Sequence, residues 1–201
     1  MSLFTWANWP LLVVCAGMIA AAIIDWWKFK VPNRLTFPLI ISGWVLGLCN
    51  NFGLEAGYNP AQGQVGGIGA ALLGTAVACA LLLPVYAIGG MGAGDVKMTM
   101  GFGSWIGAFY GTPDGLGIIF WAFCVGTIVG GIIALGMIMV RGQYRTNIQN
   151  IRDILGDFAT SSSVTEVAEK ANQRRSRWHR LPYGVPLCIG FVGYLIYLYG
   201  I

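Results

Sequence analysis

The sequence predicts an all-α polytopic membrane protein with six transmembrane helices, and three observations predict it. Of the 201 residues, 56% are hydrophobic and only 10% are charged, whereas a soluble domain carries about 25% charged residues. The apolar residues gather in segments near the length of a membrane span, which is about 20 residues. The 30 glycines suit membrane helices, because small residues let their backbones approach closely.

Prolines and an asparagine mark the ends of the first three expected spans. The first begins at Trp9 and has Pro10 in its first turn, where proline is tolerated, and the second follows Asn33, an expected N-cap. Pro84 is expected to bend the end of the third. In one membrane-embedded domain over residues 1–201, the expected spans are 9–27, 35–49, 65–88, 95–110, 116–140 and 183–201.

The last three spans enclose the longest polar segment. The fourth is short and is expected to start at Asp95 or Val96. A turn at residues 112–115 leads into the fifth, which is long enough to tilt. Residues 141–182 are expected to form one longer cytoplasmic loop before the sixth span. Apolar residues recur in this loop at helical spacing, which predicts an amphipathic helix on the membrane surface; they are Ile148, Ile151, Leu155 and Phe158.

The basic residues predict the orientation. All 12 Lys and Arg residues lie between spans one and two, at Lys97, or between spans five and six. By the positive-inside rule, these three places face the cytoplasm and both termini face outward. We expect the basic loops to contact anionic lipid headgroups, and we expect no nucleic-acid partner. No metal or other cofactor is expected, because the chain has one histidine and five scattered cysteines with no Cys-x-x-Cys pair.

Two acids lie at the cytoplasmic ends of expected spans. Asp25 closes the first span and Asp95 opens the fourth. Acids at membrane depth are costly and tend to mark function. Two neighbouring carboxylates repel, so one keeps its proton near neutral pH, and the pair then offers one base and one acid for hydrolysis of a peptide bond. The alternative is that Asp25 is an interfacial acid paired with Lys28.

Asp95 ends a glycine-rich stretch that runs from Gly90 to Gly94. Glycine adopts positive φ without strain, so a tight turn is expected whose backbone a substrate strand can reach. The alternative is a plain turn between two helices with Asp95 as N-cap. Lys97 is expected either to stabilise an ionised Asp95 or to bind headgroups, and the sequence leaves that choice open.

Three stretches resemble the type IV prepilin peptidase family, a branch of the Gly-x-Gly-Asp intramembrane aspartyl proteases. They are residues 25–33, residues 90–97 and residues 181–186. The resemblance implies that Asp25 and Asp95 are the catalytic pair. It implies as substrate a prepilin-like protein, cut between a short basic leader and an apolar helix at the cytoplasmic face. The residues expected to bind this substrate are Gly92, Gly94, Lys97, Pro32 and Asn33.

The resemblance also implies a place in the cell: a bacterial cytoplasmic (inner) membrane, in type IV pilus assembly or protein secretion. Larger family members carry an N-terminal region that supports N-methylation; this chain resembles the short form, so methylation is not expected. Two other functions stay open. One is a small proton-coupled transporter with Asp25 and Asp95 in its ion path, which the few polar residues at mid-span argue against. The other is a non-catalytic scaffold for pilus assembly or secretion.

Overall fold

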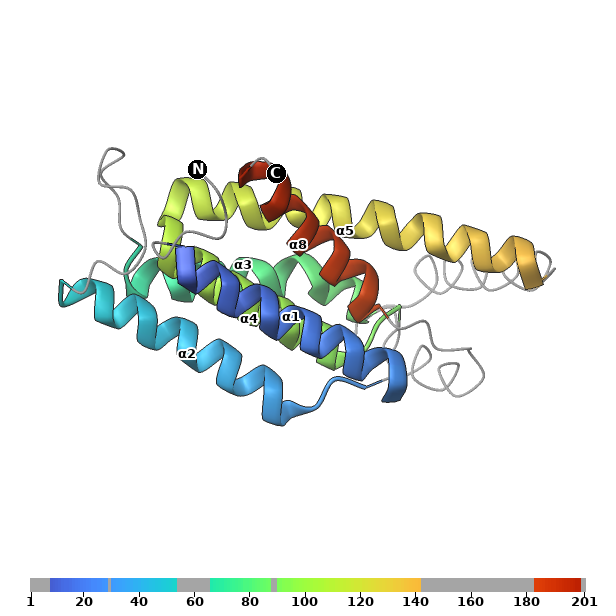
Figure 1. The fold of residues 1–201 in the computed structure, drawn as a ribbon, viewed down its shortest axis with the longest axis horizontal. Coiled ribbons are helices and arrows are strands. Elements are labelled where there is room, and N and C mark those ends of the chain that lie inside the picture. The colour runs from blue at the N-terminus through green and yellow to red at the C-terminus, as the bar shows by residue number, and fades with distance from the viewer. Residues whose placement is uncertain (1–7, 29, 54–65, 88–89, 142–182, 200–201) are drawn as a thin grey trace, which may run out of the picture.

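The computed structural model describes residues 8–28, 30–53, 66–87, 90–141 and 183–199. Within these residues the chain is all helical, with no strand (Figure 1). Two complete helices and most of a third, residues 112–137, are long and apolar enough to cross a membrane, and the last helix is shorter and also apolar. The all-α class is therefore confirmed, while six membrane crossings remain a prediction. The helices are α1 (Trp9–Lys28), α2 (Asn33–Asn51), α3 (Ile68–Ala87), α4 (Ala93–Tyr110), α5 (Thr112–Arg141) and α8 (Gly184–Tyr199).

The helices follow the expected spans, with corrections at their ends. α4 begins at Ala93, before the predicted start, because Gly92 rather than Asp95 is its N-cap. α2 has Pro32 as its N-cap, so the prediction of Asn33 there is wrong. Residues 112–115 form the first turn of α5 and not a separate turn, since a proline is tolerated where the helix N–H groups need no partner. The predicted amphipathic helix of the cytoplasmic loop lies outside the described residues.

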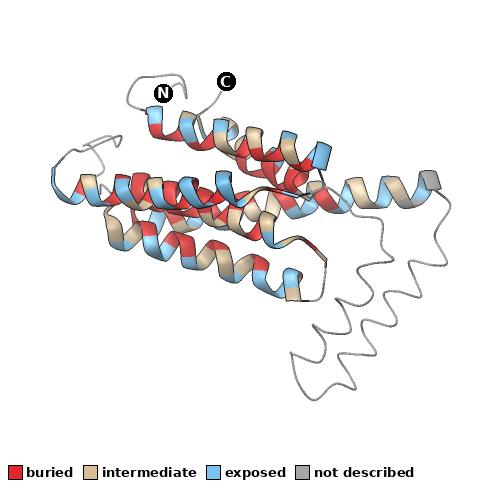
Figure 2. Ribbon diagram, turned by 90° about the horizontal axis from the view of Figure 1, so that it is seen from below, coloured by how far each residue is buried: buried red, intermediate tan, exposed pale blue. Residues whose placement is uncertain are grey.

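α4 is the central helix of the bundle. It contacts each of the other five described helices, and 13 of its 18 residues are buried. Its Thr99 and Ser104 hydroxyls donate to carbonyls of the same helix, so these buried polar groups are satisfied without water. Figure 2 shows buried residues turned toward the middle of the bundle and exposed residues turned outward. Polar side chains are tolerated in α4 because protein, and not lipid, surrounds most of this helix.

Glycines set the closest helix contacts. A Cβ at Gly74 of α3 would overlap the carbonyl oxygen of Gly103 in α4, and a Cβ at Gly103 would overlap that of Gly74. Between α5 and α8, a Cβ at Gly190 would overlap the backbone of Gly126. The expectation that glycine permits close packing is confirmed at these crossings. Gly69 has open space where a Cβ would lie, so it takes no part.

Hydrogen bonds identify the two ends of the bundle. At one end, Asn50 Nδ2 donates to the carbonyls of Gly66 (3.0 Å) and Ala108 (2.9 Å), which ties α2 to the chain before α3 and to the end of α4. The hydroxyls of Tyr110 and Tyr199 lie 2.6 Å apart at the same end. The C-terminus of α1 and the N-termini of α2, α4 and α8 converge at the opposite end, where the glycine-rich stretch lies (Figure 1). This convergence places both predicted aspartates at one end.

Candidate active site

Asp95 is held at the N-terminus of α4 by its own turn. Its Oδ2 accepts a hydrogen bond of 3.0 Å from the backbone N–H of Gly92, and its backbone N–H donates to the Gly92 carbonyl at 3.2 Å. The side chain is buried, with 5% of its surface exposed. A helix N-terminus carries partial positive charge, which stabilises a carboxylate there. The glycine-rich stretch therefore fixes the carboxylate within the first turn of the central helix.

Asp25 lies in the last turns of α1, where the helix dipole disfavours a carboxylate. The structure shows what compensates for this position. Asp25 Oδ2 accepts a hydrogen bond of 3.0 Å from the backbone N–H of Gly184, the first residue of α8. Asp25 is also buried, with 4% of its surface exposed. Each aspartate thus accepts a backbone N–H at a helix N-terminus, Asp95 from its own helix and Asp25 from α8.

The residue before α8 connects the two acids. Tyr183 directly precedes Gly184, which donates to Asp25. Tyr183 is half-buried and lies close enough to Asp95 to interact with it electrostatically. The start of α8 thus binds Asp25 through Gly184 and lies near Asp95 through Tyr183.

Gly94 lets the α1–α2 connection lie against α4. A Cβ at Gly94 would come 3.0 Å from Val31 Cβ and 3.2 Å from the Val31 backbone N and O. The next residue, Pro32, is the N-cap of α2, and its carbonyl accepts the N–H of Leu35 at 3.0 Å. None of Gly90, Gly92 and Gly94 has positive φ; among the described glycines only Gly53 and Gly111 do. The expectation of a positive-φ turn is wrong here, and close packing accounts for Gly94.

Lys97 has partners that neither sequence-based alternative named. Its Nζ donates a hydrogen bond of 3.0 Å to Asn33 Oδ1, and it lies 4.9 Å from the centre of the Phe37 ring, a cation–π distance. Both partners belong to α2. Lys97 therefore joins the first turns of α4 and α2, next to the glycine-rich stretch.

The structure thus groups the predicted site residues at one end of the bundle, and it adds two. Gly184 supplies a hydrogen bond to Asp25 across 159 positions of sequence, and Tyr183 lies near Asp95. Both lie in the stretch 181–186, which sequence analysis noted and gave no role. A role was hidden because the donor is a backbone N–H, which any residue except proline provides.

The chain is similar to known proteins over more than half of its length. The model of the Type IV leader peptidase family matches residues 12–135. The chain belongs to the type IV leader peptidase family. The matched region contains Asp25, Asp95 and the whole glycine-rich stretch, while the start of α8 lies beyond it.

Curated relatives in this family carry a related name. The protein named "Prepilin leader peptidase/N-methyltransferase" of Aeromonas salmonicida (strain A449) is 26% identical over 148 residues, which covers 70% of this chain and 44% of that protein. The protein of the same name from Neisseria gonorrhoeae is 28% identical over 141 residues, with the same coverage. The chain therefore spans less than half the length of the curated relatives it matches. No solved structure matches it.

Proposed function

We propose that this member of the type IV leader peptidase family is an intramembrane aspartyl endopeptidase. It removes the short basic leader from type IV prepilin-like proteins at the cytoplasmic face of the bacterial inner membrane. One observation carries the proposal: the two buried carboxylates, Asp25 and Asp95, lie at the same end of the bundle, each at a helix N-terminus. The names of the curated relatives support the reaction class.

The proposed reaction needs one base and one acid. The ionised aspartate takes a proton from water, and the water oxygen attacks the carbonyl carbon of the scissile peptide bond. The protonated aspartate gives its proton to the leaving nitrogen as the C–N bond breaks. The two carboxyl groups exchange protonation states in the cycle. The reaction balances whichever aspartate starts as the base, because like-charge repulsion leaves one proton on the pair.

The orientation follows from charge. Lys28, Lys30 and Arg34 flank the connection between α1 and α2, beside Asp25, and the positive-inside rule puts this end in the cytoplasm. A prepilin-like substrate enters with its leader at that side and its apolar helix in the bilayer. The same basic residues favour anionic headgroups nearby.

The test replaces each aspartate by asparagine in the membrane-inserted protein, with a prepilin co-expressed. Asparagine keeps the size of the side chain and removes the acid–base cycle. Asp25→Asn and Asp95→Asn are each expected to lower cleavage by at least about a hundredfold, the range of general acid–base catalysis. Asp114→Asn, at an exposed acid in the first turn of α5, is the matched control and is expected to cleave normally. Full processing by both active-site variants, with normal insertion, contradicts the peptidase and favours a scaffold.

A further inference from the structure

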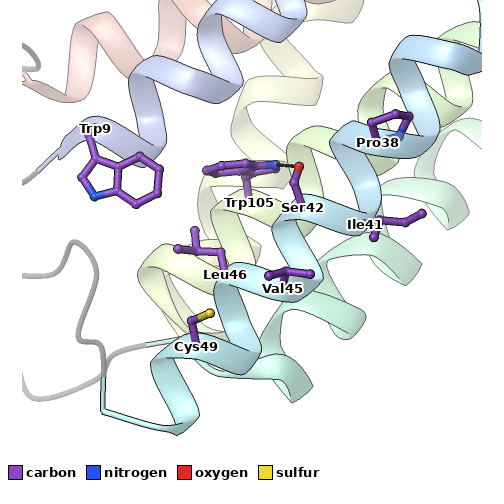
Figure 3. Close-up of a pocket in the computed structure, with 8 residues that line it drawn as sticks. All are labelled: Trp9, Pro38, Ile41, Ser42, Val45, Leu46, Cys49 and Trp105. Carbon is purple, nitrogen blue, oxygen red and sulfur yellow. Dashed lines mark hydrogen bonds between the residues drawn. The ribbon is translucent and has the colours of Figure 1, made fainter.

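An apolar groove runs along one face of α2, between α2 and the N-terminal end of α1, with α4 at its base (Figure 3). Its volume is about 680 Å³. Trp9 of α1 forms one wall, and Trp105 of α4 lies at the base. The other wall is a single helical face, because its residues recur at intervals of three and four; they are Pro38, Ile41, Ser42, Val45, Leu46 and Cys49.

The base and walls of this groove are held in place by hydrogen bonds. Trp105 Nε1 donates to the Leu39 carbonyl at 2.9 Å and contacts Ser42 Oγ at 3.2 Å. Ser42 Oγ in turn donates to the Leu39 carbonyl at 3.0 Å. Trp9 packs edge-on against Trp105, with 6.2 Å between ring centres. The polar side-chain atoms of Trp105 and Ser42 are thus bonded within the protein, and most of the remaining lining is apolar, which suits an apolar occupant.

The groove leads away from the aspartates. It begins at Pro38, five residues after Asn33, which bonds Lys97 at the aspartate end. It ends at Cys49, one residue before Asn50, which marks the opposite end of the bundle. From Pro38 to Cys49 the helical rise gives about 16 Å, more than half of the roughly 30 Å hydrocarbon core. A helix that starts at the aspartates and crosses the membrane runs in the same direction.

We propose that this groove docks the apolar helix of the leader-bearing substrate while the leader junction lies at Asp25 and Asp95. The inference rests on the proposed function and adds the surface that selects the substrate. Helices in membranes associate through close van der Waals packing, and a concave face provides more of it than a flat one. A lipid tail also fits an apolar groove. The substrate helix is favoured over a lipid tail as occupant, because a leader bound at the aspartates makes docking of the attached helix intramolecular.

The first test fills the groove. Ile41 lies in the groove and is 51% exposed, and Ile132 of α5 is 63% exposed on a helix that does not contact α1 or α2. Each lies about 12–14 Å along its helix from the predicted cytoplasmic end, by helical rise. Ile41→Trp and Ile132→Trp are assayed in lipid with two substrates that share leader and cut site. One substrate continues into an apolar helix, and the other into a polar, water-soluble segment.

The measured quantity is the ratio of kcat/KM for the helix substrate to kcat/KM for the polar substrate. Ile41→Trp is expected to lower this ratio about tenfold, which is about 1.4 kcal/mol of lost binding, and Ile132→Trp is expected to leave it unchanged. If the parent protein cleaves both substrates and Ile41→Trp has the same ratio of kcat/KM values as the parent, the docking proposal is wrong and the proposed peptidase function still stands. Parent protein that cleaves neither substrate overturns the proposed function and this inference with it.

The second test needs no activity. Cys49 lines the groove. Cys124 of α5 is the matched control, because it lies at a similar distance along its helix from the predicted cytoplasmic end. Variants that keep only one of these cysteines, in the Asp25→Asn background, are oxidised with a substrate carrying a single cysteine. Cross-linking to Cys49 is expected for a cysteine about 16 residues beyond the scissile bond, the helical distance from Asn33 to Cys49, and no cross-link is expected to Cys124. Two outcomes overturn the proposal. One is a disulfide between the Cys49 residues of two copies of this protein, with no cross-link to substrate. The other is no cross-link to Cys49 at all, with lipid still bound to the purified protein.

Discussion

The carboxylate of Asp25 caps the N-terminus of α8 through a 3.0 Å hydrogen bond from the backbone N–H of Gly184. A carboxylate that its own helix dipole disfavours is thereby held by the dipole of another helix. The contact requires glycine for space: a Cβ at position 184 would lie 2.9 Å from Asp25 Oδ2 and 3.1 Å from Asp25 Cβ. The first residue of α8 therefore sets where the Asp25 side chain lies.

Gly184→Ala is expected to displace the Asp25 carboxylate and to lower kcat by about tenfold to about a hundredfold, because small misplacements of a catalytic group carry costs of that size. KM is expected to change little, since the proposed docking groove for the substrate helix lies away from Gly184. The control is Gly193→Ala on the same helix, where a Cβ meets nothing within 4 Å. Steady-state kinetics and melting temperature are measured for both. A Gly184→Ala variant with normal kcat contradicts a positioning role for this contact.

The bond between Lys97 and Asn33 leads to a second prediction. If Lys97 acts by joining α4 to α2, Lys97→Met and Asn33→Leu each lower kcat/KM by about twofold to tenfold, the range for loss of one hydrogen bond. The double variant is then no worse than either single variant, because both changes remove one interaction. Lys28→Met, at an exposed lysine of α1, serves as control. A shift in the pH–rate profile with Lys97→Met alone would instead indicate direct action on Asp95.

Chelation gives a third prediction. The proposed hydrolysis uses two carboxyl groups and water, so excess EDTA is expected to leave the rate of prepilin cleavage unchanged within error. Among the described residues, no three His, Cys, Asp or Glu side chains come together as a metal site would require. A zinc-dependent peptidase treated in parallel shows that the chelator is effective. Strong loss of cleavage with EDTA, restored by a divalent cation, counts against the two-aspartate reaction.

The sequence predicted the parts of the site that depend on local pattern. Apolar length and Lys/Arg placement predicted the spans and put Asp25 and Asp95 at one end, and the structure confirms their shared end. The sequence did not predict the contacts between segments that are far apart in the chain. Nothing local in Gly184 indicates that its N–H reaches Asp25, and nothing in Lys97 indicates a partner on α2. The predicted start of α4 at Asp95 or Val96 was too late, since the helix begins at Ala93. The alternative with Asp95 as N-cap is also wrong: aspartate is a favoured N-cap, but here Asp95 accepts the Gly92 N–H from inside the helix.

The last prediction separates two explanations of Gly94. Sequence analysis expected Gly94 to let a substrate strand approach, while the structure shows Val31 at the position of its missing side chain. In the packing explanation, Gly94→Ala forces the α1–α2 connection to move by a few tenths of an ångström and lowers kcat severalfold. Val31→Gly then restores part of the loss, because it removes the closest contact, at 3.0 Å. In the substrate explanation, Gly94→Ala raises KM and Val31→Gly restores nothing. Gly117→Ala, where a Cβ has open space, is the control, and kinetics of the four variants decide between the explanations.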